Sequence, residues 1–450
     1  MRSLLALVAA LGLLAPSAAW AAQPFKLIRA DETYAYLKPE PDRRGLDPLR
    51  YIPLGETAYL SLGGEARLRV DTIDAPRFGV GGARADTFAL TRLLLSADLH
   101  INPKVRIYGQ LGLHHDLDKK EPPGASDRDD LDAQVLFVDL APAENWRLRL
   151  GRQELSFNPA QRFVSVREGP NIRQSFDGAR LSFGRGKLQA DAIFVHPVAI
   201  EHGAFDDGGD RDQRFWGLYA SAPIARNVSL DLYALNLDRD HARFGAVTGD
   251  ERRRSVGARL SGKLGAVDYE AEGMLQRGRF AGRDIRAWGG SVGAGYTIGS
   301  PWAPRLGVRH DAGSGDKDPA DDRLGTFNPL FPRGAYFNQA SLVSWSNLSA
   351  WRASLGARPS KSLSFEISRT ERRRRSGRDA VYLQPMAVLA GSAASPAREV
   401  SDDWQVDLGW EINRNLRVQL QAVHVKAAAA VKAVGGRDVD FGLATVQFRF

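Results

Sequence analysis

Arginine is the residue type in this sequence with the greatest capacity for chemistry. The chain contains 61 basic residues, of which 50 are arginine and 11 are lysine, against 53 acidic residues, so its formal net charge is +8. The planar, permanently charged guanidinium group pairs with carboxylates and phosphates, whereas the lysine ammonium is a flexible point charge. The excess of arginine predicts an anionic partner: nucleic acid, a lipid headgroup or an acidic ligand.

Other reactive residues form no recognisable catalytic pattern. The chain has no cysteine, which excludes disulfides, thiolate zinc sites, iron–sulfur clusters and cysteine nucleophiles. The eight histidines are scattered, without the spacing of a metalloprotease site. Residues 206–210 and 311–322 hold enough carboxylates for Ca²⁺, but neither segment has the EF-hand pattern. We therefore predict no catalytic residues, no metal site and no cofactor.

The first 21 residues have the pattern of an export signal. Met1-Arg2-Ser3 precedes an apolar run over residues 4–14, and Ala19-Trp20-Ala21 is a cleavage signature of small residues. The alternative is an N-terminal membrane anchor, but the apolar run is too short to span a bilayer as a helix. We expect a signal peptide over residues 1–21. Export argues against nucleic acid as a partner.

Beyond residue 58 the sequence alternates between apolar and polar residues. In the segment 61–70, one face carries Leu62, Leu68 and Val70, and the other carries Glu65 and Arg67. Side chains on a β-strand point alternately to opposite faces, so each such segment is a strand with one apolar and one polar face. About eighteen segments have this pattern: 59–73, 86–100, 104–114, 132–140, 145–154, 174–183, 187–196, 213–221, 228–238, 252–262, 266–277, 285–298, 305–312, 348–358, 361–370, 402–412, 415–425 and 439–450.

The connections between these segments alternate between short and long. Tight turns are expected at 102–103, 141–142, 184–186, 223, 262–265, 301–304, 358–360 and 413–415, and longer polar loops between them. This order is typical of a transmembrane antiparallel β-barrel with short periplasmic turns and long extracellular loops. An even number of strands places both ends of the barrel sequence on the periplasmic side.

A soluble β-sandwich or propeller is the alternative fold. It would bury one face of each strand, but the polar faces here carry too much charge for a dry core. Apolar faces turned toward lipid and charged faces turned toward water remove this conflict, and spanning strands must close into a barrel to pair their backbone groups. We therefore predict a signal peptide (1–21), a periplasmic N-terminal lead-in that is exposed (22–57) and an outer-membrane β-barrel (58–450).

The phase of each strand predicts which residues face the interior. About eighteen strands enclose an aqueous channel. The acidic candidates include Glu65, Asp231, Glu270, Glu366 and Asp407. Rings of arginine select anions, but an ion-paired wall that only rigidifies the barrel is an equally good interpretation of any single arginine. The basic candidates for the pore lining are Arg67, Arg69, Arg92, Arg106, Arg147, Arg149, Arg180, Arg259, Arg309, Arg352 and Arg417.

One loop, residues 155–173, is a candidate for a constriction inside the pore. It carries Arg162, Arg167 and Arg173 together with Phe163 and two prolines. A loop of this composition can fold into a barrel and narrow it, although an exposed loop is the commoner arrangement. Both interpretations remain open from the sequence.

Several motifs resemble the alginate export family of outer-membrane porins. They include Gly151-Arg152-Gln153-Glu154-Leu155, the segment 169–178 (GPNIRQSFDG), Gly315-Asp316-Lys317-Asp318 and the segment 327–334 (FNPLFPRG). The resemblance covers about residues 50–450. It implies an eighteen-stranded monomeric barrel whose electropositive, arginine-lined constriction passes a polyuronate.

We expect selective passage of an anionic polysaccharide or oligosaccharide, with an alginate-like polyuronate as the leading substrate. The alternatives are an importer of small organic anions or oligosaccharides, an outer-membrane enzyme and a plugged, structural barrel. The expected partners are outer-membrane lipid, lipopolysaccharide, the saccharide and the barrel-assembly machinery, with the barrel monomeric.

Overall fold

The computed structural model describes residues 25–38, 45–245 and 247–450. The expected signal peptide over residues 1–21 lies outside the described residues. No helix in the described ranges is long and apolar enough to cross a membrane.

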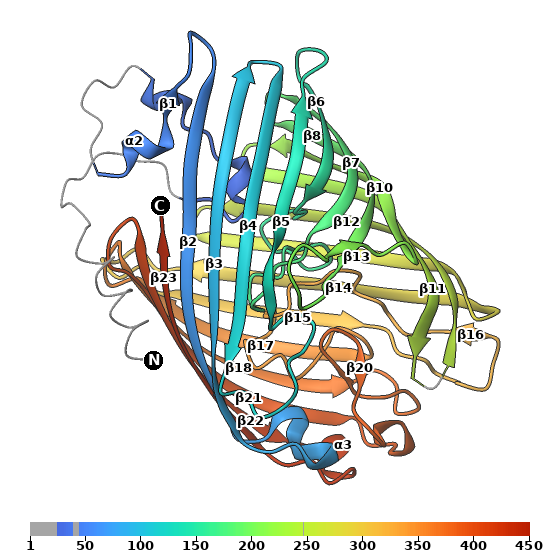
Figure 1. The fold of residues 1–450 in the computed structure, drawn as a ribbon. Coiled ribbons are helices and arrows are strands. Elements are labelled where there is room, and N and C mark those ends of the chain that lie inside the picture. The colour runs from blue at the N-terminus through green and yellow to red at the C-terminus, as the bar shows by residue number, and fades with distance from the viewer. Residues whose placement is uncertain (1–24, 39–44, 246) are drawn as a thin grey trace.

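The fold is a closed antiparallel β-barrel (Figure 1). In the described part of the chain, eighteen long strands follow one another around the barrel in sequence order, and β2 pairs with β23 to close it. These strands are β2 (Tyr59–Ile73), β3 (Asp86–Asn102), β4 (Val105–Leu117), β5 (Asp129–Leu140), β6 (Trp146–Gln153), β7 (Phe176–Arg185), β8 (Leu188–Ala199), β10 (Gln213–Ala225), β11 (Val228–Phe244), β12 (Val247–Leu264), β13 (Val267–Phe280), β14 (Arg283–Thr297), β15 (Arg305–Gly313), β17 (Leu348–Ala357), β18 (Leu363–Arg374), β21 (Glu399–Glu411), β22 (Leu416–Ala427) and β23 (Val439–Arg449).

The remaining elements are short. The strands β1, β9 and β16 pair at the margins of the barrel sheet, and β19 pairs only with β20. Their bounds, with those of the helices, are β1 (Ile52–Pro53), β9 (Gly208–Gly209), β16 (Arg323–Leu324), β19 (Tyr382–Leu383), β20 (Ala387–Val388), η1 (Arg29–Asp31), η2 (Ala35–Leu37), α2 (Asp47–Arg50), η3 (Pro76–Gly82), η4 (Ser392–Ala394) and α3 (Ala429–Lys432).

The predicted barrel and its strand order are confirmed. Each of the eighteen predicted segments coincides with one barrel strand, and the connections predicted to be short all lie at the same end as the two termini of the barrel. At the opposite end, β11–β12 and β13–β14 are also joined by two-residue connections, where longer loops were expected. Two details differ. The β11–β12 hairpin is longer than expected, and Pro223 lies within β10 rather than in the turn. The register shifts between Pro223 and Ala225, and such an irregularity accommodates a residue that lacks a backbone N–H.

The outer surface of the barrel is apolar and the inner surface is polar. Large apolar side chains on the outer phase remain exposed, for example Leu218 at 61% and Val256 at 62%. Side chains on the inner phase, such as Glu65, Arg92 and Asp231, are almost completely buried. This arrangement matches a wall that meets lipid outside and water inside.

The main hydrophobic core lies inside the barrel. Phe163 comes from the long loop 154–175, and its ring contacts Phe327 and Trp345 of a second long loop, residues 314–347. The loops also pair through their backbones, since Phe331 N donates to Phe163 O at 3.0 Å. Each loop therefore packs against the other and against the wall.

The lead-in before the barrel is not exposed throughout, contrary to expectation. Ile28 and Ala30 are buried in a cluster with inward-facing aromatic residues of β4 and β5. Arg29 donates to Gly64 O and to Phe450 O at 3.1 and 2.8 Å. Arg29 therefore ties the lead-in to the seam where the C-terminal end of the chain meets β2.

Candidate functional site

Arginines of the barrel wall hold the 154–175 loop inside the lumen. Arg67 and Arg69 lie on the inner face of β2 and donate to backbone carbonyls of the loop. Arg67 reaches Glu168 O at 3.0 Å and Pro170 O at 2.9 Å, and Arg69 reaches Gly169 O at 2.5 Å. The loop therefore lies inside the barrel rather than exposed outside it.

A cluster of arginines and glutamates fixes the inner end of this loop. Arg92 pairs with Glu65 at 2.6 Å and with Glu168, and Arg173 pairs with Glu154 at 2.8 Å and with Glu168 at 3.2 Å. The result is a buried network in which Glu168 is shared between strand β3 and the loop's own Arg173.

The two loop carboxylates of this cluster have opposite pKa shifts. Burial opposes ionisation of Glu168, but the guanidinium groups of Arg92 and Arg173 outweigh it and lower its pKa to about 2. Burial dominates at Glu154 and raises its pKa to about 7, although Arg173 acts in the other direction. Glu168 is therefore ionised at neutral pH, and Glu154 titrates close to neutral pH.

A second set of contacts fastens the loops to the opposite wall. Arg162 pairs with Glu272 of β13 at 2.7 Å and with Glu270, and its Nε donates to the Tyr336 hydroxyl at 2.9 Å. Tyr336 in turn donates to Asp311 of β15 at 2.9 Å. Both loops are thus held between β2–β3 on one side and β13–β15 on the other.

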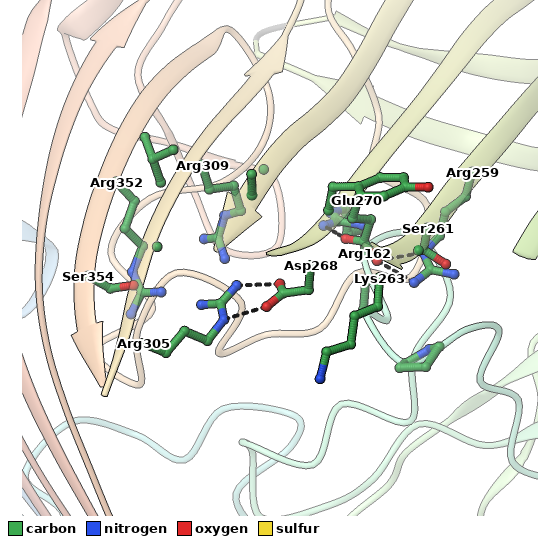
Figure 2. Close-up of a pocket in the computed structure, with 18 of the residues that line it drawn as sticks. Arg162, Arg259, Ser261, Lys263, Asp268, Glu270, Arg305, Arg309, Arg352 and Ser354 are labelled. Carbon is green, nitrogen blue, oxygen red and sulfur yellow. Dashed lines mark hydrogen bonds and ion pairs between the residues drawn. The ribbon is translucent and has the colours of Figure 1, made fainter. Parts of the chain in front are cut away.

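A large cavity between the inner loops and the periplasmic turns has a volume of about 670 Å³ (Figure 2). Within it, Arg305 and Asp268 form a paired salt bridge, as the dashed lines in Figure 2 show. Its lining contains seven basic and three acidic side chains: Arg162, Arg259, Lys263, Arg305, Arg309, Arg333 and Arg352 against Asp268, Glu270 and Glu366.

Smaller cavities continue this space through the barrel. A cavity of 370 Å³ shares Arg305 and Glu366 with the large one and adjoins the periplasmic turns. A cavity of 310 Å³ lies on the extracellular side. Between them is a narrow cavity of 80 Å³, which shares Arg417 with the periplasmic side and Arg69 with the extracellular side. This cavity is the smallest of the four, and we refer to it as the candidate constriction, or simply the constriction.

Three arginines and one glutamate line this constriction. Arg67 and Arg69 project from β2, Arg417 projects from β22, and Glu168 comes from the inner loop. Gln339 of the 314–347 loop completes the ring and accepts a hydrogen bond from Arg69 at 3.1 Å. On the surface of this cavity basic side chains outnumber acidic ones, although Arg69 also pairs with Asp71 and Arg417 with Glu411 outside it.

The structure divides the predicted arginines into two groups. Arg259, Arg309 and Arg352 line the large cavity, whereas Arg67, Arg69 and Arg417 line the constriction. The other strand arginines line none of these four cavities. Most of them pair with acidic neighbours in the wall, as the ion-paired interpretation predicts: Arg92 with Glu65, Arg106 with Asp98, Arg149 with Asp139 and Arg180 with Asp191, while Arg147 is exposed at the start of β6.

The three loop arginines take different places. Arg162 lies against β13 in the large cavity, and Arg167 and Arg173 line the extracellular cavity. Arg167 makes no ion pair with any described residue; its guanidinium lies 5.9 Å from the centre of the Phe331 ring, and burial lowers its pKa to about 10. It is a cation without a protein counter-charge beside the constriction.

Sequence periodicity missed several residues of the path. Arg333, Tyr336 and Gln339 lie in the 314–347 loop, where no strand phase exists to predict their direction. The only signal was the FNPLFPRG motif, which contains Arg333 but does not indicate that it faces the lumen. Lys263 was missed because its strand was expected to end at residue 262.

Solved structures similar to this one are outer-membrane porins. Pseudomonas aeruginosa OpdO has a TM-score of 0.58 and 14% identity over 87% of this chain and 97% of its own. Acinetobacter baumannii OccAB1 has a TM-score of 0.58 and 12% identity over 86% and 96%. Pseudomonas aeruginosa OccK2 (OpdF), solved in complex with glucuronate, has a TM-score of 0.56 and 13% identity over 87% and 98%. At these identities the similarity shows a shared fold.

No curated protein matches the sequence. A family model described as alginate export matches residues 58–444, which include nearly the whole barrel and both inner loops. The chain therefore belongs to the alginate export family and is a channel-forming β-barrel of the bacterial outer membrane.

Proposed function

We propose that this channel passes anionic saccharides selectively, with an alginate-like polyuronate exported as its main substrate. The observation that carries the proposal is the charge of the path. Three arginines face one glutamate at the constriction, and seven basic side chains face three acidic ones in the large cavity. The family's description as alginate export supports the choice of substrate.

The geometry suits transport rather than tight binding. Most lumenal guanidinium groups already pair with a carboxylate of the protein, for example Arg352 with Glu366 at 2.6 Å. A sugar carboxylate can exchange with such a partner without leaving the arginine unpaired. Many weak sites of this kind allow a polyanion to move, whereas one deep site would hold it in place. The proposal needs no catalytic residue, metal or cofactor.

A second candidate function is the import of small organic anions or oligosaccharides. The constriction has a volume of only 80 Å³ and lies between two larger cavities, which favours the passage of small molecules over that of a polymer. The complex of OccK2 with glucuronate shows that a barrel of this fold binds a single uronate. In both cases the recognised group is a sugar carboxylate.

The barrel also indicates the other partners of the protein and how the chain is processed and inserted. Its apolar outer band contacts outer-membrane lipid, and we infer that the extracellular rim meets lipopolysaccharide. We also infer that the signal peptide (1–21) is removed, that the lead-in (22–57) remains periplasmic, and that the barrel-assembly machinery inserts the barrel (58–450) as a monomer.

Planar-bilayer recordings test the proposal. The reversal potential in a KCl gradient is expected to show preference for chloride, and polymannuronate is expected to block the current at concentrations where uncharged dextran of the same length does not. Cation preference contradicts the anion pathway. Block by glucuronate with no additional effect of the polymer supports the small-anion importer instead.

A further inference from the structure

A cluster of aspartates lies at the extracellular end of the barrel, away from the path. Asp132 belongs to β5, and Asp206 and Asp207 belong to the loop between β8 and β10. One carboxylate oxygen from each lies within 4.8 Å of the others. Two oxygens that bind the same Ca²⁺ at about 2.3–2.6 Å are at most about 5 Å apart, so this spacing fits a shared cation.

A fourth aspartate, Asp129, provides a second observation that favours a bound cation, independent of the spacing of the other three. Asp129 of β5 is 2% exposed, and its Oδ1 atom has no hydrogen-bond partner. Its strongest electrostatic interactions are with the carboxylates of Asp207, Asp132 and Asp206. The nearest basic group is the buried His114, whose Nδ1 lies 3.9 Å from Asp129 Oδ2, too far for a hydrogen bond. A buried carboxylate beside three others, without a donor among the described residues, is costly unless a cation neutralises it.

The protein supplies only part of the positive charge. Arg152 donates to Asp132 at 3.1 Å, but it also forms a paired salt bridge with Asp177. One guanidinium therefore faces five carboxylates.

The hydrogen bonds leave oxygens available in the loop. Asp206 accepts from Gly203 N through Oδ2, and Asp207 accepts from Glu201 N through Oδ1. The second oxygen of each carboxylate accepts no hydrogen bond from the described residues. The loop is held next to β5 because Phe205 N donates to Leu131 O at 2.9 Å, so the available oxygens are already in place.

We propose that Asp132, Asp206 and Asp207 form a Ca²⁺ site that ties the β8–β10 loop to the end of β5, with the buried Asp129 adding negative charge beside it. All donors are oxygens, and two of them come from a loop, which suits the larger and less demanding Ca²⁺ better than the strictly octahedral Mg²⁺. The role of the cation is to hold the loop against the barrel rim.

The test uses the full chain refolded in detergent micelles free of lipopolysaccharide, so that any divalent cation binds the protein itself. After treatment with a chelator, calorimetric titration with CaCl₂ is expected to show one site with a Kd of about 10⁻⁴–10⁻³ M, as in extracellular calcium modules. MgCl₂ is expected to bind at least about tenfold more weakly, because the site does not impose octahedral geometry.

The double variant Asp206→Asn/Asp207→Asn is expected to weaken Ca²⁺ binding by about tenfold or more, because it removes two anionic ligands. Asp212→Asn is the matched control, since Asp212 is exposed in the same loop and outside the cluster. Heat-modifiable migration on a gel establishes that each variant is folded. Absence of Ca²⁺ binding in the unmodified chain, equal affinity for Mg²⁺, or equal weakening by Asp212→Asn overturns the proposal.

Discussion

Arg333 differs from most arginines of the lumen because no described carboxylate pairs with it. Its backbone N–H donates to Gln161 O, which fixes the loop, while its guanidinium is exposed to the large cavity. Burial by the surrounding wall lowers the pKa of Arg333, and Glu168 acts in the opposite direction. Its charge therefore acts on the passing ion rather than on a protein partner.

Replacing this charge is expected to reduce selectivity without affecting the fold. One unit charge about 4 Å from an ion is worth about 1 kcal/mol in water, so Arg333→Gln should lower the chloride-to-potassium permeability ratio by up to about fivefold. Reversal potentials in planar bilayers measure the ratio. Arg279→Gln is the control, because Arg279 is 75% exposed on the outer phase of β13. An unchanged ratio in Arg333→Gln contradicts the role given to this residue.

Glu154 makes the charge of the interior depend on pH. Burial raises its pKa to about 7, above the ordinary value for glutamate, so it is mostly ionised at pH 8 and mostly protonated at pH 6. Lowering the pH therefore removes one negative charge and leaves Arg173 less compensated.

Anion selectivity should consequently rise between pH 8 and pH 6. The folded state also binds a proton that the unfolded chain releases, so this group lowers stability as the pH rises from about 4.5 to 7. Reversal potentials across this range measure the change in selectivity. Glu154→Gln is expected to abolish the pH dependence and to keep the low-pH selectivity at pH 8. Persistence of the pH dependence in this variant would assign it to another group.

The two inner loops lie inside the lumen, fastened to β2–β3 on one side and to β13–β15 on the other. At the level of elements, the strands could be predicted from the sequence because alternation with a period of two is local. The position of the 154–175 loop could not, because it depends on partners far away in sequence, such as Arg162 with Glu272 and Tyr336. For the same reason, strand phase found Arg67 and Arg417 but could not separate them from Arg149, whose Asp139 partner lies on the neighbouring strand.

Shortening the 154–175 loop should therefore widen the pore. Replacing residues 159–171 with a short glycine–serine linker removes Glu168 and the main-chain partners of Arg67 and Arg69 from the constriction. Single-channel conductance is expected to rise roughly twofold or more, with reduced selectivity. The same linker inserted after Gly245, which is exposed between β11 and β12, should change neither quantity. Equal conductance in the shortened channel would locate the constriction elsewhere.

The whole molecule depends on keeping its two surfaces distinct. A charge on the lipid-facing surface has no water and no partner, whereas the lumen offers both. Leu218→Arg places a guanidinium on the outer face of β10 and should cost about 2–4 kcal/mol if the site is near the bilayer centre. Ser221→Arg is the matched variant, because position 221 pairs in register with Asp231 on the lumenal phase. Reversible denaturant unfolding in lipid vesicles measures both, and equal costs would contradict the assigned orientation.

The short strand β1 has a consequence for the edge of the barrel. β23 covers β2 only from Glu65 onward, and Phe450 exchanges hydrogen bonds with Gly64 just below that point. Tyr59 and Leu60 extend past the end of the chain and pair instead with Pro53 and Ile52 of β1. Backbone groups left open at such a step invite an extended peptide to add as an extra strand. The protein occupies the outer part of that edge with its own residues, Ile52 and Pro53, which leaves less of it open to another strand.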